Sequence, residues 1–165
     1  VQAQGPTADD QSRHLWQPRF VEAARVLDLQ LFIVSFAAPA ELPEVVASAA
    51  RQGADALLVD EISILSWPAQ QRALSEVAAR HGLLVMHSIL SATDNGALMA
   101  FGRDFTVDFA RLAHFVDRIL RGTPPGELPI EQPTRFELVV NLRTAKALGV
   151  TLSQSLLHRA DRVIE

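Results

Sequence analysis

Short, continuous apolar runs alternate along this sequence with longer segments whose apolar residues recur at helical spacing. Continuous apolar runs of four to six residues are typical of strands that are covered on both faces, as in parallel sheets. Their alternation with helices is typical of α/β proteins, in which helices flank the sheet. The sequence therefore predicts an α/β fold with a parallel sheet flanked by helices.

The alternation extends as far as Gly122. The predicted strands are residues 31–36, 56–59, 83–86 and 97–101, and the predicted helices are residues 12–29, 39–51, 68–81 and 106–121. Glycine follows three of these helices and is expected to cap them, because it adopts the left-handed conformation without strain. Pro18 is expected in the first turn of its helix, where its missing N–H costs little. We interpret residues 1–122 as one Rossmann-like lobe.

The pattern changes after Gly122, where prolines gather. Because proline restricts itself and its predecessor to extended or turn geometry, residues 123–134 are predicted to form an extended connector. A strand at 136–140 and helices at 142–148 and 153–164 follow, the last with Ser153 as its N-cap. We expect the 136–140 strand not to lie beside the 97–101 strand. Residues 123–165 are thus interpreted as a connector and a C-terminal strand–helix segment.

Composition and charge exclude several classes of function. The net charge is −4 and the basic residues are scattered, so nothing indicates binding to nucleic acid. The chain has no cysteine, which excludes disulfides, thiolate nucleophiles and cysteine-bound zinc. No apolar run reaches the length of a membrane span, and the first residues lack the basic and apolar regions of an export signal.

Motifs of catalysis and of cofactor binding are missing. The sequence contains no GxGxxG fingerprint, no phosphate-binding loop ending in GK[ST], no GxSxG nucleophile elbow and no HExxH pair. The histidines are spread along the chain, and His81 at a helix end is read as compensating the helix dipole. We therefore expect no enzyme activity, no cofactor and no metal.

Five residues that close or directly follow the apolar runs form the candidate binding site. They are Ser35, Phe36, Asp60, Ser88 and Phe101. In open α/β sheets, ligands bind just beyond the carboxyl ends of the strands. Helix N-termini at that edge favour an anionic group such as a carboxylate. Phe101 would supply a flat apolar wall, and Asp60 would suit an amine or a hydroxyl.

Structural alternatives remain open for these residues. Asp60 and Glu61 could simply cap the next helix or face water, or could form a general-base or Mg²⁺ site, although no partner group is evident. Phe101, followed by Gly102, could be a core or hinge aromatic.

The C-terminal third carries the most specific sequence. Its central run is IEQPTRFELVVNLRTAKALG at residues 130–149, and the chain ends in SLLHRADRVIE. Together with GALMAFG at 96–102 and HFVDRILRG at 114–122, these segments resemble ABC-transporter substrate-binding proteins with the type I periplasmic-binding fold. The resemblance is strong over residues 96–165 and agrees in topology upstream.

This resemblance implies a protein of two lobes that close around a small solute outside the cytoplasm, with a membrane permease and an ATPase as partners. It also implies that the usual N-terminal lobe is missing, so that a second lobe or a second chain would have to complete the cleft. The family commonly has Tyr-Gly-Pro where this chain has Phe101-Gly102-Arg103, and the chain contains no tyrosine.

The sequence therefore favours a solute-binding component of an ABC transporter, or part of one, that binds a small organic ligand by lobe closure. The alternative is a stand-alone regulatory or interaction domain derived from such a protein, as a monomer or a dimer, without a transport role.

Overall fold

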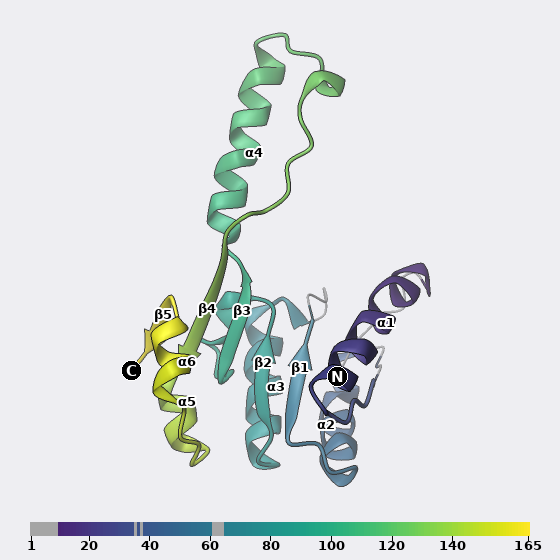
Figure 1. The fold of residues 1–165 in the computed structure, drawn as a ribbon, viewed down its shortest axis with the longest axis vertical. Coiled ribbons are helices and arrows are strands. Elements are labelled where there is room, and N and C mark those ends of the chain that lie inside the picture. Colours follow the sequence, from purple (N-terminus) through teal and green to yellow (C-terminus); the bar gives the residue numbers. More distant parts are fainter. Residues whose placement is uncertain (1–9, 35, 37, 61–64) are drawn as a thin grey trace.

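A mostly parallel sheet of five strands forms the centre of the molecule and confirms the predicted fold class (Figure 1). The computed structural model describes residues 10–34, 36, 38–60 and 65–165. The strands are β1 (Ala56–Val59), β2 (Leu84–His87), β3 (Met99–Arg103), β4 (Phe136–Asn141) and β5 (Arg162–Ile164), and they lie in this order across the sheet. β1, β2 and β3 are parallel, β4 runs antiparallel to β3, and β5 is parallel to β4.

The pairing of β3 with β4 contradicts the expectation that these strands would not be neighbours. Phe101 of β3 lies opposite Leu138 of β4, and Arg103 lies opposite Phe136. The chain leaves the sheet at the end of β3, runs out along a helix and comes back along the connector. Because this excursion returns the chain to the point of departure, β4 enters the sheet beside β3 and in the opposite direction.

The main core lies between β1, β2 and two helices on one face of the sheet. These helices are α2 (Leu42–Arg51), preceded by a 3₁₀ turn at Pro39–Glu41, and α3 (Pro68–Arg80). Gly53 and Gly82 follow them with φ of 85° and 69°, as the predicted caps require. The core consists of apolar side chains from all four elements, among them Val46, Leu57, Val59, Leu74, Ala78 and Val85.

The apolar run at 31–36 does not form the predicted strand. Residues 31–34 and 36 have no regular secondary structure, and Ser35 lies outside the described residues. Apolarity favours burial in general, whereas a strand also needs a neighbouring strand to hydrogen-bond. Phe36 is buried without being part of a strand: its side chain is 3% exposed and packs in the core with α2.

Smaller differences concern the ends of elements. β2 and β3 begin one and two residues later than predicted. The helix predicted at 153–164 ends at Arg159 as α6 (Gln154–Arg159), and the chain continues as β5. Pairing with β4 selects the strand for the last residues of the chain. Ser153 is the N-cap as predicted, since its side chain accepts a hydrogen bond from the backbone N–H of Leu156.

The first helix, α1 (Asp10–Val26), contains Pro18 in its interior rather than in its first turn. The predicted start at Ser12 was too late, because the polar residues before it continue the helix without contributing to an apolar stripe. Val21 and Val26 are 54% and 69% exposed.

The longest described excursion from the sheet is an arm made of α4 (Phe105–Leu120) and the connector that follows it. Asp104 caps α4 by accepting a hydrogen bond from the N–H of Thr106, and Gly122 ends it with a φ of 98°. Residues 121–135 have little regular structure, apart from a 3₁₀ turn at Pro125–Glu127, which agrees with the prediction. In Figure 1 the arm stands away from the sheet.

The C-terminal segment completes the far edge of the sheet. Asn141 is the N-cap of α5 (Leu142–Ala147), because its side chain accepts a hydrogen bond from the N–H of Thr144, and α6 and β5 follow. β4 and β5 share one sheet with β1 to β3. The domain boundary placed at residue 122 stays a prediction. In the described part of the chain, no helix combines the length and the apolarity needed to cross a membrane.

Candidate functional site

The carboxyl ends of β1 and β2 bring two of the predicted site residues together. Asp60 follows β1, Ser88 follows β2, and the two strands are parallel neighbours. The backbone N–H of Ser88 donates a hydrogen bond to the carbonyl of Val59 at 3.0 Å, so the residues after both strands are held side by side. Asp60 and Ser88 are both half-buried, and they follow neighbouring strands at this edge of the sheet.

Gly102 brings β3 close to Ser88, at the same edge of the sheet. A Cβ atom at this position would lie 1.8 Å from the carbonyl oxygen of Ser88, so any larger residue would force the two backbones apart. This close approach places Phe101, the preceding residue, beside Ser88. The hydroxyl oxygen of Ser88 is buried and has no hydrogen-bond partner among the residues that the structure describes. An unsatisfied hydroxyl at the edge of a sheet is a ready donor or acceptor for a bound group.

Phe101 forms an aromatic wall with a residue that the sequence did not identify, Phe136 on β4. Their ring centroids are 5.8 Å apart with an interplanar angle of 22°. The two side chains are 50% and 49% exposed, so the stacked pair presents an open apolar surface. Phe136 was missed because β4 was not expected beside β3. We name Asp60, Ser88, Phe101 and Phe136 the sheet-rim site.

His87, the last residue of β2, directly precedes Ser88 and helps to position it. Its side chain is 1% exposed, and burial lowers its pKa to about 4, against smaller opposing effects of the Leu65 backbone and the Asp60 charge. The neutral ring accepts a hydrogen bond at Nδ1 from the backbone N–H of Ile89 at 2.9 Å. This bond spans Ser88 and fixes the turn that carries it. At neutral pH the ring has no charge to offer a solute.

Of the other two predicted site residues, only Phe36 is described, and it is not part of this cluster. Phe36 packs in the core, and Ser35 lies outside the described residues, as does Glu61. Their participation in ligand binding stays a prediction.

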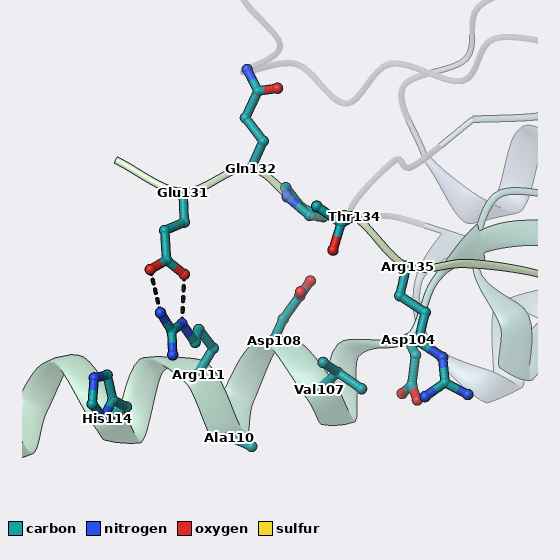
Figure 2. A pocket seen from close by; sticks show the side chains of 11 residues that line it. Asp104, Val107, Asp108, Ala110, Arg111, His114, Glu131, Gln132, Thr134 and Arg135 are labelled. Carbon is teal, nitrogen blue, oxygen red and sulfur yellow. Dashed lines mark hydrogen bonds and ion pairs between the residues drawn. The ribbon is translucent and has the colours of Figure 1, made fainter. Parts of the chain in front are cut away.

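A second place with many polar groups lies between α4 and the connector (Figure 2). The cavity has a volume of about 450 Å³. It is lined by Asp104, Val107, Asp108, Ala110, Arg111, His114 and residues 131–135. Sequence reasoning did not single out this region, because residues 123–134 were predicted only as an extended connector, without contacts to α4.

Most of the charges around this cavity have partners within the chain. Arg111 donates two hydrogen bonds to the carboxylate of Glu131, which lowers the pKa of Glu131 and raises that of Arg111 (Figure 2). Asp108 pairs with Arg103 at 3.2 Å, and Asp104 caps α4. These groups attach the connector to α4. The sheet-rim site, with its unsatisfied hydroxyl and its open aromatic wall, is therefore the better candidate for binding a solute.

Comparison with known proteins identifies a family over most of this chain. Residues 19–164 match the family model described as ABC transporter substrate binding protein. No curated protein matches the sequence at a significant level.

Solved structures share the fold over almost the whole chain. A conserved domain protein from Vibrio cholerae superposes with a TM-score of 0.84 at 19% identity, over 98% of this chain and 53% of that chain. An ABC domain from Streptococcus pneumoniae in complex with L-Trp gives 0.84 at 17% identity, over 99% and 54%. A ligand-free, open substrate-binding protein with adhesive properties from Clostridium difficile gives 0.66 at 16%, over 99% and 53%. The chain spans about half the length of these proteins.

Proposed function

Because the chain belongs to the ABC transporter substrate-binding protein family, we propose that it binds a small organic solute at the sheet-rim site and delivers it to a membrane permease. The convergence of three strand ends on one edge supports this site most directly, since it combines an acid, a free hydroxyl and an aromatic wall. Ser35 and Phe36 remain predicted members of the site.

The proposed solute is an amino acid with an aromatic side chain. The stacked rings of Phe101 and Phe136 offer a flat apolar surface to such a side chain. The carboxylate of Asp60 would accept hydrogen bonds from the α-amino group, and the Ser88 hydroxyl would donate to the carboxylate. The pneumococcal neighbour, which was solved with L-Trp, supports this choice of ligand class.

The proposed mechanism is closure of a second lobe over the rim. A solute that contacts both lobes stabilises the closed state by its differential affinity for that state. The family also motivates the remaining parts of the proposal: a location outside the cytoplasm, and a permease with its ATPase as downstream partners.

Calorimetry with L-tryptophan tests the site. One lobe offers half of a cleft, so the expected dissociation constant of this chain is roughly millimolar. Asp60→Ala and Phe101→Ala should each weaken binding by about tenfold, which is the worth of one charged hydrogen bond or one aromatic contact. Phe109→Ala is the matched control, because Phe109 is 66% exposed but lies on α4.

Two results would count against the proposal. Equal affinity of the wild type, Asp60→Ala and Phe101→Ala would place the ligand elsewhere. Absence of binding by any aromatic amino acid, in the chain extended by a second lobe as well as alone, would remove the proposed ligand class.

A further inference from the structure

Gln71 on α3 is a glutamine in the interior of the molecule, with 1% of its surface exposed. Glutamine usually lies at the surface, because burial of its amide costs free energy unless the amide is hydrogen-bonded. Here Nε2 donates to the carbonyl of Ser66 at 3.2 Å, and Oε1 accepts from Asn95 Nδ2 at 2.9 Å and from Ser91 Oγ at 3.4 Å. These bonds join α3 to the residue just before its N-cap and to the loop between β2 and β3.

The loop between β2 and β3 begins with Ser88 of the sheet-rim site. A 3₁₀ turn at Leu90–Ala92 follows, and it contains Ser91, a partner of Gln71. Asn95 also donates from Nδ2 to the carbonyl of Ser91 at 3.0 Å, which closes the loop on itself. Because a hydrogen-bonded turn lies between Ser88 and the attachment to α3, a shift of that attachment would also move Ser88.

The same loop has a second attachment, on the side of β4 and α5. Asn141 is 7% exposed, and its Nδ2 donates to the carbonyl of Thr93 at 2.8 Å. Thr144 Oγ1 donates to the carbonyl of Gly96 at 3.2 Å. Loss of the Gln71 bonds should therefore free one side of the loop while the other side stays attached and the sheet stays folded.

We propose that Gln71 is a positioning residue of the sheet-rim site, which fixes the loop that carries Ser88 to α3. Its side chain is buried, so it acts on a solute through Ser88 and not by contact. A hydroxyl that is already held in place binds a solute more tightly, because binding does not have to order the loop. The inference deepens the proposed function and rests on it for the solute.

Hydrogen exchange and binding of L-tryptophan, measured on the same variants of this chain, test the proposal. Gln71→Met keeps an unbranched side chain and removes all three hydrogen bonds. The backbone amides of residues 92–97 should then exchange about tenfold faster, because local opening of the loop becomes easier. The dissociation constant for L-tryptophan, from an NMR titration, should rise about fivefold.

Ser75→Ala is the matched control. Ser75 is also buried on α3, but its hydroxyl bonds within the helix, to the backbone carbonyl of Gln71 at 2.9 Å. The variant removes a buried polar group of α3 without touching a bond to the loop. It should change the exchange of residues 92–97 and the affinity by less than about twofold.

Gln71→Glu separates positioning from a loss of packing, because the charge of the introduced carboxyl depends on pH. The neutral carboxyl can donate to the Ser66 carbonyl and accept from Asn95, whereas the ionised form has no donor. Burial raises the pKa of a carboxyl, so the variant should bind L-tryptophan like the wild type at about pH 5.5 and like Gln71→Met at about pH 8. The affinity is expressed as a ratio to the wild type at each pH, which removes the titration of other groups.

Several results would overturn the proposal. One is equal exchange of residues 92–97 in the wild type and Gln71→Met, and another is an unchanged affinity of Gln71→Met although the loop exchanges faster. Effects of Ser75→Ala as large as those of Gln71→Met would mean that weakening of α3 explains both. If the wild type binds no aromatic amino acid, the proposed function fails, and the exchange measurement, which needs no solute, still decides whether Gln71 holds the loop.

Discussion

α3 and α4 are helices of similar length, but α3 packs against the sheet and α4 does not. α3 has 13 residues, of which Leu74, Val77 and Ala78 are among those buried against the sheet. α4 has 16 residues and the more strongly one-sided apolar pattern, yet none of its residues is buried. The comparison teaches that amphipathicity states the need for a partner surface and does not say which surface meets it.

The largest expected difference between the two helices is the loss of stability when a leucine is truncated. Leu74 is 1% exposed and Leu112 is 55% exposed. Leu74→Ala should lower the free energy of unfolding by about 2–5 kcal/mol, because it leaves a cavity. Leu112→Ala should change it by less than about 0.5 kcal/mol in this chain. Urea denaturation measures both, and similar losses would mean that α4 is packed in solution.

Acid should destabilise the packed region through His87. Its pKa is about 4 in the folded chain and about 6.5 when unfolded, so between these values the unfolded chain binds the proton first. Stability is therefore complete above pH 6.5 and falls as the pH decreases towards 4, by about 3 kcal/mol. His87→Asn should remove this part of the pH dependence. Parallel profiles of the wild type and His87→Asn between pH 7 and 4 would contradict the prediction.

The smallest expected effect concerns the ion pair that holds the arm together. Glu131→Gln should leave the urea midpoint of the sheet unchanged, because exposed ion pairs contribute little to global stability. Limited proteolysis of the connector should nevertheless become several-fold faster, since Arg111 no longer fastens it. Glu44→Gln, which breaks the exposed Glu44–Arg51 pair on α2, is the control and should leave connector cleavage unchanged.

Elements whose signals are local could be predicted from the sequence. β1, α2, α3 and α4 follow from apolar spacing and from glycine caps such as Gly53 and Gly122, which act within one helical turn. The prediction of an extended connector also depended only on neighbouring prolines. These features succeed because backbone propensity and capping involve residues that are close in the sequence.

The candidate site could be predicted in part. Asp60, Ser88 and Phe101 come together because parallel strands place their carboxyl ends at one edge, a rule that needs only the order of elements. Phe136 could not be found in this way, because its position beside Phe101 depends on the antiparallel pairing of β4 with β3.

The sequence by itself determined the alternation of strands and helices, the caps that end them and the edge at which polar groups follow the strands. Only the tertiary structure decided that 31–34 remains unpaired, that 162–164 joins the sheet as β5, and that α4 stands apart from it. Apolar residues lower their free energy by burial against any suitable surface, so their pattern leaves the partner undetermined. Hydrogen bonds between strands, and the path by which the chain comes back to the sheet, fix that partner. Both bring together residues that are distant in the sequence.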